Sequence, residues 1–537
     1  MPASYTYPGV YIEEIPSGVH TIAGVSTSDT AFVDFFKRGP LDEAVRISSF
    51  GDFERVFGGL DARSEGSYAI QQFFLNGGSV AWVVRVAAGY YDSASLTLQG
   101  GSPLQDTLTV SAASPGVWGN NLQIGIDYKT PDPDTQFNLV VREVATVRGK
   151  QQVVNSETYR NLSMSKTSSR YAVSVVNEAS SLIELTDLGV GLRPAATGAD
   201  VIGSPSPPDA GSYSNFHALD ASGNDGAEPG TAGWTSNGPT AVVGDENAKT
   251  GMFALDRIEP AIFNILCIPA AANFDADGIN AVIPKAEQYC LEKRAFLIID
   301  IPETVDTPAD MVAWMTDNDG LRHTNAAVYF PRLEIPDPLN ENRPRNTGAS
   351  GTMAGVYART DATRGVWKAP AGTDADLRGA TLAIKLTDGE NGALNPLGIN
   401  AFRNFPIFGN ISWGARTLDG ADQAASEWKY IPVRRTALYI EQSLYEGSKW
   451  IVFEPNDERL WSQIRLNFGA FMHSLFRQGA FQGTTPKDAY FVKCDSETTT
   501  QNDIDLGVVN IIVGFAPLKP AEFVVIKIQQ MAGQIEV

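Results

Sequence analysis

Residues 450–537 constrain the fold most, because the residue types there mark a helix, several strands and a linker in turn. Asn456 suits the N-cap position, and the two acidic residues that follow it suit the positive end of a helix dipole. An apolar stripe then recurs at steps of three and four residues, which predicts an amphipathic helix over residues 456–478. Its members are Leu460, Ile464, Phe468, Phe471 and Leu475.

Short β-prone runs flank this helix. We expect one strand before it, over 451–453, and three after it, over 489–493, 508–515 and 523–529. Two prolines within residues 516–520 exclude both a helix and a central strand in the linker before the last run. The last run carries apolar side chains on both faces and would invite aggregation if its edges stayed open. It therefore needs a partner, either residues 508–512 of the same chain or a strand of another chain.

Strands and helices alternate in two further parts of the chain, residues 25–89 and 246–420. The run over 80–86 is almost continuously apolar, which is typical of a strand buried on both faces of a parallel sheet. Pro284 suits the first position of a helix, and two glycines weaken the helix expected over 351–361. We predict that the two parts share one sheet in an α/β core of mixed α+β character.

Residues 90–245 separate these two parts and differ from them in composition. They are rich in Ser, Thr, Gly, Asp and Pro and contain short alternating β runs, which predicts a β-rich inserted domain that can be separated from the core. The predicted organisation is an arm over 1–24, core segments over 25–89 and 246–420, the insert over 90–245, a C-terminal core domain over 421–515, and a linker and arm over 516–537.

Charge and cysteine content exclude several classes of partner. The net charge is −21, from 62 acidic and 41 basic residues, so the chain lacks the basic surface that nucleic acid or an anionic membrane requires. Three cysteines without metal-ligand spacing predict reduced, buried thiols. No run of about 18 apolar residues is present, so we expect no direct membrane insertion and folding in a cytoplasm.

A search for catalytic motifs gives little. There is no HExxH, GxSxG or phosphate-binding loop. Asp300, Asp306 and Asp337 lie at predicted strand ends, where α/β enzymes keep catalytic groups, and they are the best argument for an enzyme. No basic or nucleophilic residue accompanies them in the sequence. Cys494 lies on a predicted strand, where a cysteine packs more often than it reacts. We therefore expect no catalytic, cofactor-binding or metal-binding residues.

Several separate motifs, in order along the chain, resemble contractile tail sheath proteins, the sheath subunits of myophage tails, R-type tailocins and phage-like contractile injection systems. The resemblance covers about the first 90 and the last 290 residues and does not distinguish these three kinds of particle. The motifs are YPGVYIEE at 7–14, LNPLGIN at 394–400, ISWGARTL at 411–418, DAYFVKCD at 488–495, NDIDLG at 502–507 and FAPLKPAEF at 515–523.

This resemblance implies that subunits lend their terminal strands to neighbours, and that residues 20–29 and 516–522 act as tethers. Seven extended residues span roughly 23–25 Å. The implied residues are Val10, Tyr11 and Ile12 in the N-terminal arm, Phe523, Val524, Val525, Ile526 and Ile528 in the C-terminal arm, and Tyr490, Val492, Val509, Ile511 and Val513 in the strands that accept an arm.

The resemblance also implies a function. The chain would polymerise around an inner tube and contract to drive that tube through a target envelope, and the helix over 456–478 would face the tube through Glu458, Arg459, Gln463 and Arg465. The implied partners are further copies of the chain, the inner tube protein, and baseplate and terminal cap proteins. Assembly is expected in the bacterial cytoplasm, as part of a phage tail or phage-like particle. An α/β enzyme with a β-rich insertion and a static tube or shell protein are the alternatives.

Overall fold

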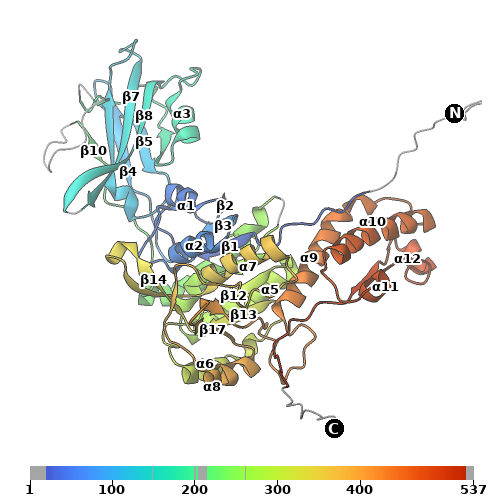
Figure 1. Ribbon diagram of the computed structural model, residues 1–537. Coiled ribbons are helices and arrows are strands. Elements are labelled where there is room, and N and C mark those ends of the chain that lie inside the picture. The colour runs from blue at the N-terminus through green and yellow to red at the C-terminus, as the bar shows by residue number, and fades with distance from the viewer. Residues whose placement is uncertain (1–19, 148, 199–200, 203–214, 260–261, 528–537) are drawn as a thin grey trace, which may run out of the picture. The chain divides into compact units, whose positions relative to one another are not determined.

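The computed structural model describes residues 20–147, 149–198, 201–202, 215–259 and 262–527 (Figure 1). The chain divides into two compact units. One consists of Met1–Val25 with Arg435–Val537, and the other is Ser26–Arg434. The predicted N-terminal arm residues Val10, Tyr11 and Ile12, and Ile528 of the C-terminal arm, lie outside the described residues.

An eight-stranded sheet forms the centre of the larger unit, in the order β18-β17-β13-β12-β11-β1-β3-β2. The strand pairs from β17 through β3 are parallel, and the two edge strands are antiparallel to their neighbours. Thr30 of β1 pairs with Ile265 of β11, so segments far apart in the sequence share one sheet, as predicted. The bounds are β1 Thr30–Asp34, β2 Ala44–Ile47, β3 Ala81–Arg85, β11 Ile265–Cys267, β12 Phe296–Ile299, β13 Ala326–Phe330, β17 Asn400–Phe405 and β18 Gly409–Ser412.

Two helices beside this sheet, α2 and α7, pack closely because of two glycines (Figure 1). A Cβ at Gly351 would lie 2.1 Å from the carbonyl oxygen of Ala69, and one at Gly355 would lie 2.6 Å from that of Phe73. The glycines that weakened the predicted helix are therefore required by its packing. The helices of this unit are α1 Phe50–Phe57, α2 Glu65–Asn76, α4 Ala232–Val243, α5 Ala276–Lys293, α6 Pro308–Asp317, α7 Ser350–Arg364 and α8 Asp388–Leu394.

Helix α5 begins eight residues before the predicted start. Asp275 is its N-cap and accepts a hydrogen bond from the backbone nitrogen of Gly278, which leaves Pro284 inside the helix. Burial of Ile279, Val282 and Ile283 against the core offsets the backbone hydrogen bond that proline cannot make.

Residues 90–245 contain two sheets with an apolar core of their own. One has the order β10-β6-β7-β8 and the other β4-β5-β9. Helix α4, inside the predicted range of the insert, instead places Trp234, Val242 and Val243 in the main core. The bounds are β4 Ser95–Gly100, β5 Gln105–Ala112, β6 Leu122–Asp127, β7 Gln136–Val147, β8 Lys150–Ser163, α3 Ala172–Ala179, β9 Ile183–Asp187 and β10 His217–Ala218. A third small sheet contains β14 Leu333–Asp337, β15 Arg343–Thr347 and β16 Thr381–Leu382.

The smaller unit is organised around α10, Glu458–Arg477. Its predicted apolar stripe is buried. The N-cap is Asp457 rather than Asn456, whose side chain instead binds the carbonyl of Val508 and the indole of Trp461. The predicted strand over 451–453 is wrong, because Lys449–Ile451 is a single 3-10 turn, η7. The other elements are α9 Ile431–Gly447, which crosses the division between the units, α11 Pro486–Ala489, β19 Tyr490–Lys493, α12 Gln501–Asp505 and β20 Ile512–Phe515.

Candidate assembly surfaces

Strands β19 and β20 form a two-stranded antiparallel sheet beside α10. Tyr490 lies opposite Phe515, and Val492 lies opposite Val513. Neither strand pairs with a further strand in the part of the chain that the structure describes. A two-stranded sheet is marginal in water, and each outer edge exposes backbone donors and acceptors. The geometry therefore offers two positions at which another strand can be added.

Only part of the predicted accepting surface is in strand conformation. Tyr490 and Val492 lie in β19 and Val513 lies in β20, but Val509 and Ile511 precede β20, which begins at Ile512. The backbone before β20 makes hydrogen bonds to other groups instead. The nitrogen of Val508 donates to the carbonyl of Asp503, and that of Asn510 donates to the hydroxyl of Thr499. These bonds close the turn after α12 and take donors that a longer strand would use.

The segment after the proline linker, residues 521–527, has no regular secondary structure. Phe523, Val524, Val525 and Ile526 are 75–81% exposed. The alternative in which this run pairs with residues 508–512 of its own chain is not found within the described residues. Four consecutive large apolar side chains in water are unfavourable, at about 25 cal/mol for each Å² left exposed. Within the described residues, the β-prone run of Phe523, Val524, Val525 and Ile526 therefore pairs with no strand.

The predicted N-terminal tether is not free chain over its whole length. Residues 20–25 lie along α9, where Ile22 is buried against Gly447 and the backbone nitrogen of Val25 donates to the hydroxyl of Ser443 at 3.2 Å. The tether prediction is therefore wrong for these residues. Sequence pattern did not reveal this docking because a single buried apolar residue has no periodicity.

The four residues predicted to face a tube differ in exposure and in hydrogen bonding. Arg465 donates to Glu458 at 2.6 Å and also to the carbonyl of Cys494, while Gln463 is half-buried. Arg459 is exposed and forms no ion pair with any described residue. Three residues that the sequence reasoning missed are exposed on the same stripe of α10, namely Leu466, Ala470 and Arg477. Their spacing from Arg459 (seven, eleven and eighteen residues) matches one face of a helix.

The acidic residues that supported an enzyme have separate structural roles. Asp300 accepts a hydrogen bond from the backbone nitrogen of Ser350 at 2.8 Å, which caps α7, and burial raises the pKa of its carboxyl group to about 6. Asp337 accepts from the hydroxyl of Tyr68 and the nitrogen of Leu339, while Asp306 is exposed. Asp300 and Asp337 thus bind different partners. Cys494 is buried, and burial raises its pKa to about 11, which keeps it as a thiol.

No cluster of three or more His, Cys, Asp or Glu side chains with metal-binding geometry occurs in the described part of the chain. Within that part, none of the helices combines the length and the apolar character needed to cross a bilayer.

The part of the chain that contains β19 and β20 matches a known protein family. Residues 423–531 match the family described as the phage tail sheath C-terminal domain. The resemblance to tail sheath proteins is confirmed. The tail sheath protein of Vibrio phage KVP40 is 24% identical over 324 residues, which is 54% of this chain and 46% of that protein. A putative prophage major tail sheath protein of Pseudomonas aeruginosa (strain UCBPP-PA14) is 26% identical over 45% of this chain and 60% of that protein. The chain thus spans about half the length of the tail sheath relatives it matches.

Solved structures extend the likeness in fold to nearly the whole chain. The contracted sheath complex of an extracellular contractile injection system, PVC, matches with a TM-score of 0.57, 22% identity and coverage of 98% of both chains. A sheath tail protein of Listeria innocua matches with a TM-score of 0.57, 14% identity and coverage of 93% of this chain and 96% of that one. The predicted fold class, a mixed α/β core with a β-rich insert, is confirmed.

Proposed function

We propose that this chain is the structural subunit of a contractile sheath, linked to its neighbours by exchanged terminal strands. The observation that carries the proposal is the exposed run of Phe523, Val524, Val525 and Ile526 in a unit whose β19–β20 sheet has open edges. Adding a strand to an edge satisfies the ladder hydrogen bonds and covers apolar side chains at once. The relatives named above are tail sheath proteins and support the same function.

Strand exchange suits an assembly that has to move. The C-terminal segment of one copy reaches a neighbour's sheet through residues 516–522, and the N-terminal arm, with Val10, Tyr11 and Ile12, reaches another through residues before 20. Each docked large side chain contributes about 1.5–3 kcal/mol, whereas ordering the strand costs about 1–2 kcal/mol per residue. The net gain per arm is modest, and repetition along the polymer makes it decisive.

The remaining partners follow from this function. The polymer encloses an inner tube, and it meets a baseplate at one end and a cap at the other. A baseplate complex of the anti-feeding prophage is among the structures with a similar fold, which supports the baseplate contact. Assembly takes place in the bacterial cytoplasm, within a phage tail or a phage-like particle. The extended polymer is a kinetically trapped state whose release drives the tube forward, so the subunit acts mechanically and without catalysis.

Deletion of residues 521–537, or separately of residues 2–15, tests the proposal. We expect each deletion to leave a soluble, folded subunit that no longer forms tubes in electron micrographs. A milder pair, Phe523→Asp with Ile526→Asp, should act in the same way. Tyr90→Asp, at an exposed residue of the larger unit, should not. Normal tubes from the deleted chains would show that these segments do not link subunits.

Electron microscopy also separates the alternatives. A sheath should show two length states, whereas a static shell should show one. A monodisperse globular particle under all conditions would favour the enzyme alternative.

A further inference from the structure

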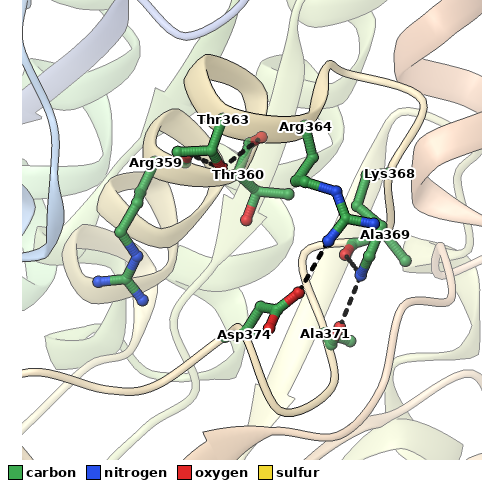
Figure 2. Close-up of a pocket in the computed structure, with 9 residues that line it drawn as sticks. Arg359, Thr360, Thr363, Arg364, Lys368, Ala369, Ala371 and Asp374 are labelled. Atoms are coloured by element: carbon green, nitrogen blue, oxygen red, sulfur yellow. Dashed lines mark hydrogen bonds and ion pairs between the residues drawn. The ribbon is translucent and has the colours of Figure 1, made fainter.

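One pocket of the larger unit holds cationic side chains that already have partners. Figure 2 shows Arg364 paired to Asp374, and the ammonium of Lys368 donating to two backbone carbonyls. These side chains are therefore bonded to groups of their own chain. In the described part of the chain, backbone groups without such partners lie in the smaller unit, at the outer edges of the β19–β20 sheet, and these are suited to an added strand.

The ladder between β19 and β20 determines which backbone groups point outward. The nitrogen of Ala516 donates to the carbonyl of Ala489 at 2.8 Å, one step beyond the pairing of Tyr490 with Phe515. Hydrogen-bonded and non-hydrogen-bonded pairs alternate in an antiparallel ladder. Phe515 and Val513 in β20 therefore direct their N–H and C=O groups away from β19, and the residues opposite them in β19 direct theirs to the other outer edge.

The outward groups of β19 are partly used within the subunit. The N–H group of Tyr490 donates to the carbonyl of Pro486 in α11. At the other end of the strand, the carbonyl of Cys494 accepts a hydrogen bond from the guanidinium of Arg465. Within the described residues, this leaves the carbonyl of Tyr490 and the two backbone groups of Val492 for an added strand.

The outward groups of β20 have no partner among the described residues. Both the N–H and the C=O of Val513 and of Phe515 are open to an added strand. The longer open row suits the longer donated segment. Residues 523–527 are five consecutive residues without Gly or Pro, whereas the N-terminal arm has residues 10–12 between a Pro-Gly pair and two glutamates. The C-terminal segment therefore matches the β20 edge, and the shorter arm matches the β19 edge.

One face of the sheet packs on α10. The hydroxyl of Tyr490 lies 3.2 Å from Nδ1 of His473 in α10, and residues opposite each other in a ladder share a face. Phe515 and, two residues before it, Val513 therefore face α10 as well. Both side chains are only half-buried, so apolar surface beside them is open at the β20 edge.

The opposite face of the sheet is open to water. Phe491 and Ile512 are 55% and 49% exposed there. The ring of Phe491 lies over Gly514, where a Cβ would come within 2.2 Å of it. A strand added to β20 thus has one side towards α10 and the other side in line with Phe491 and Ile512.

The C-terminal segment has two sides of matching character. Val524 and Ile526 are aliphatic and lie on one side of an extended chain, while the charged Lys527 follows Phe523 and Val525 on the other side. An aliphatic side meets α10 without burying a charge. The side that carries Lys527 fits the open face, where its ammonium stays in water.

We propose that residues 523–527 of one copy add to the β20 edge of a second copy, with Val524 and Ile526 towards α10 and Phe523 and Val525 on the open face. The inference rests on the proposed strand exchange. It adds which edge receives the C-terminal segment and which two side chains specify the contact.

Two double variants of the segment test which side faces α10. Val524→Asp with Ile526→Asp should raise the protein concentration needed for tube formation at least about tenfold, because it buries carboxylates among apolar side chains. Phe523→Asp with Val525→Asp is the matched control and should raise it only slightly, because those side chains stay in water. All four side chains are 75–81% exposed in the subunit, so neither pair should lower its unfolding midpoint. Equal effects of the two pairs on assembly, or a stronger effect of the second pair, would overturn the proposal.

Cysteine cross-linking of the full chain tests which edge receives the segment. Chains with Phe523→Cys or Val525→Cys are mixed with an Ile512→Cys chain under assembly conditions and oxidised. Adjacent strands lie about 4.8 Å apart, so a strand on the β20 edge is one spacing from Ile512 and two spacings from Phe491. We expect disulfide-linked dimers with Ile512→Cys and none with Phe491→Cys, the control on the same open face. The three natural cysteines are buried, which keeps the background low.

The cross-linking separates this inference from the function on which it rests. Tubes with cross-links to Phe491→Cys, or to neither acceptor, would overturn the assignment to the β20 edge and leave the sheath function intact. A wild-type chain that forms no tubes would overturn the proposed function, and this assignment with it.

Discussion

The imidazole of His20 stacks on the indole of Trp450, with ring centroids 4.2 Å apart and 14° between the ring planes. The two residues are 430 positions apart, and together with Ile22 and Val25 they fix the start of the described chain along α9. If the N-terminal arm is exchanged, it leaves the subunit at Trp450. The free length available to that arm is then shorter than a tether over residues 20–29 would give, because residues 20–25 are held in place.

Gly24 is the residue that permits this docking. A Cβ there would lie 2.0 Å from the hydroxyl oxygen of Tyr439, so Gly24→Ala should displace residues 20–25 from α9, at a cost of about 1–3 kcal/mol. Limited proteolysis should then cut within this segment. The double variant Gly24→Ala with Tyr439→Phe removes the closest atom and should restore protection. Gly320→Ala, where a Cβ meets nothing within 4 Å, is the control. Unchanged proteolysis in the Gly24 variant would contradict the docking.

Glu287 gives the subunit a defined pH dependence. It is buried on α5, one of its carboxylate oxygens has no hydrogen-bond partner, and burial raises its pKa to about 8. Because the folded-state pKa lies above the unfolded value, the stability that this group contributes is complete below about pH 4.5 and is lost as pH rises towards 8. Glu287→Gln removes the titration and should raise the free energy of unfolding near pH 7.5 by about 2–3 kcal/mol.

Urea unfolding between pH 5 and 8 measures this effect. The wild-type curve should fall with rising pH and the Glu287→Gln curve should be flatter. Glu292→Gln, on the exposed side of the same helix, should follow the wild type. Parallel curves for wild type and Glu287→Gln would show that Glu287 is ionised in the folded chain.

Periodic burial explains what the sequence revealed about this fold. The stripe of α10 from Leu460 to Leu475 and the apolar run of β3 are visible because many residues repeat one pattern. Contacts made by single residues have no such pattern. Asp457 rather than Asn456 is the N-cap of α10, because the side-chain amide of Asn456 is hydrogen-bonded to the carbonyl of Val508 and to the indole of Trp461. Both of these residues come later in the chain. The two glycines that counted against a helix over residues 351–361 are the same ones that allow α7 to pack close to α2.

The candidate surfaces show the same difference between features with a sequence pattern and contacts of single residues. Alternation and proline spacing indicated a C-terminal segment in need of a partner, and Phe523 to Ile526 are exposed. The sequence pattern did not indicate that Arg465 donates hydrogen bonds to Glu458 and to the carbonyl of Cys494, because such contacts depend on tertiary geometry. The limits of the insert over 90–245 stay a prediction.

The base of the insert allows that prediction to be tested sharply. Its two ends lie side by side, because the nitrogen of Ala227 donates to the carbonyl of Ala88 at 2.7 Å. Replacing residues 90–226 by a short Gly/Ser bridge should therefore give a folded core. We expect a loss of about 2–3 kcal/mol, because the guanidinium groups of Arg85 and Arg63 lose the carbonyl of Pro115 and the carboxylate of Asp225.

The longer excision of residues 90–245 is the matched comparison. It also removes α4 and with it the buried side chain of Trp234, so it should yield insoluble or molten protein. Thermal unfolding followed by near-UV circular dichroism separates the two. Equal behaviour of both excised chains would show that α4 does not support the core.

The outward stripe of α10 gives the last prediction, which concerns the proposed contact with an inner tube. Arg459 and Arg477 are exposed and unpaired among the described residues, with Leu466 between them, so the face suits an acidic partner. Arg459→Glu should weaken binding of the tube about tenfold at low salt, with a smaller difference at high salt because exposed charges are screened. The subunit should unfold at an unchanged temperature. Arg465→Glu is the contrast, because Arg465 bonds to Glu458 and the carbonyl of Cys494 within the subunit. It should lower the unfolding temperature and affect the tube contact only through that loss. Co-sedimentation of sheath with tube across a salt series measures both, and equal tube binding by Arg459→Glu and wild type at low salt would remove this face of α10 from the tube contact.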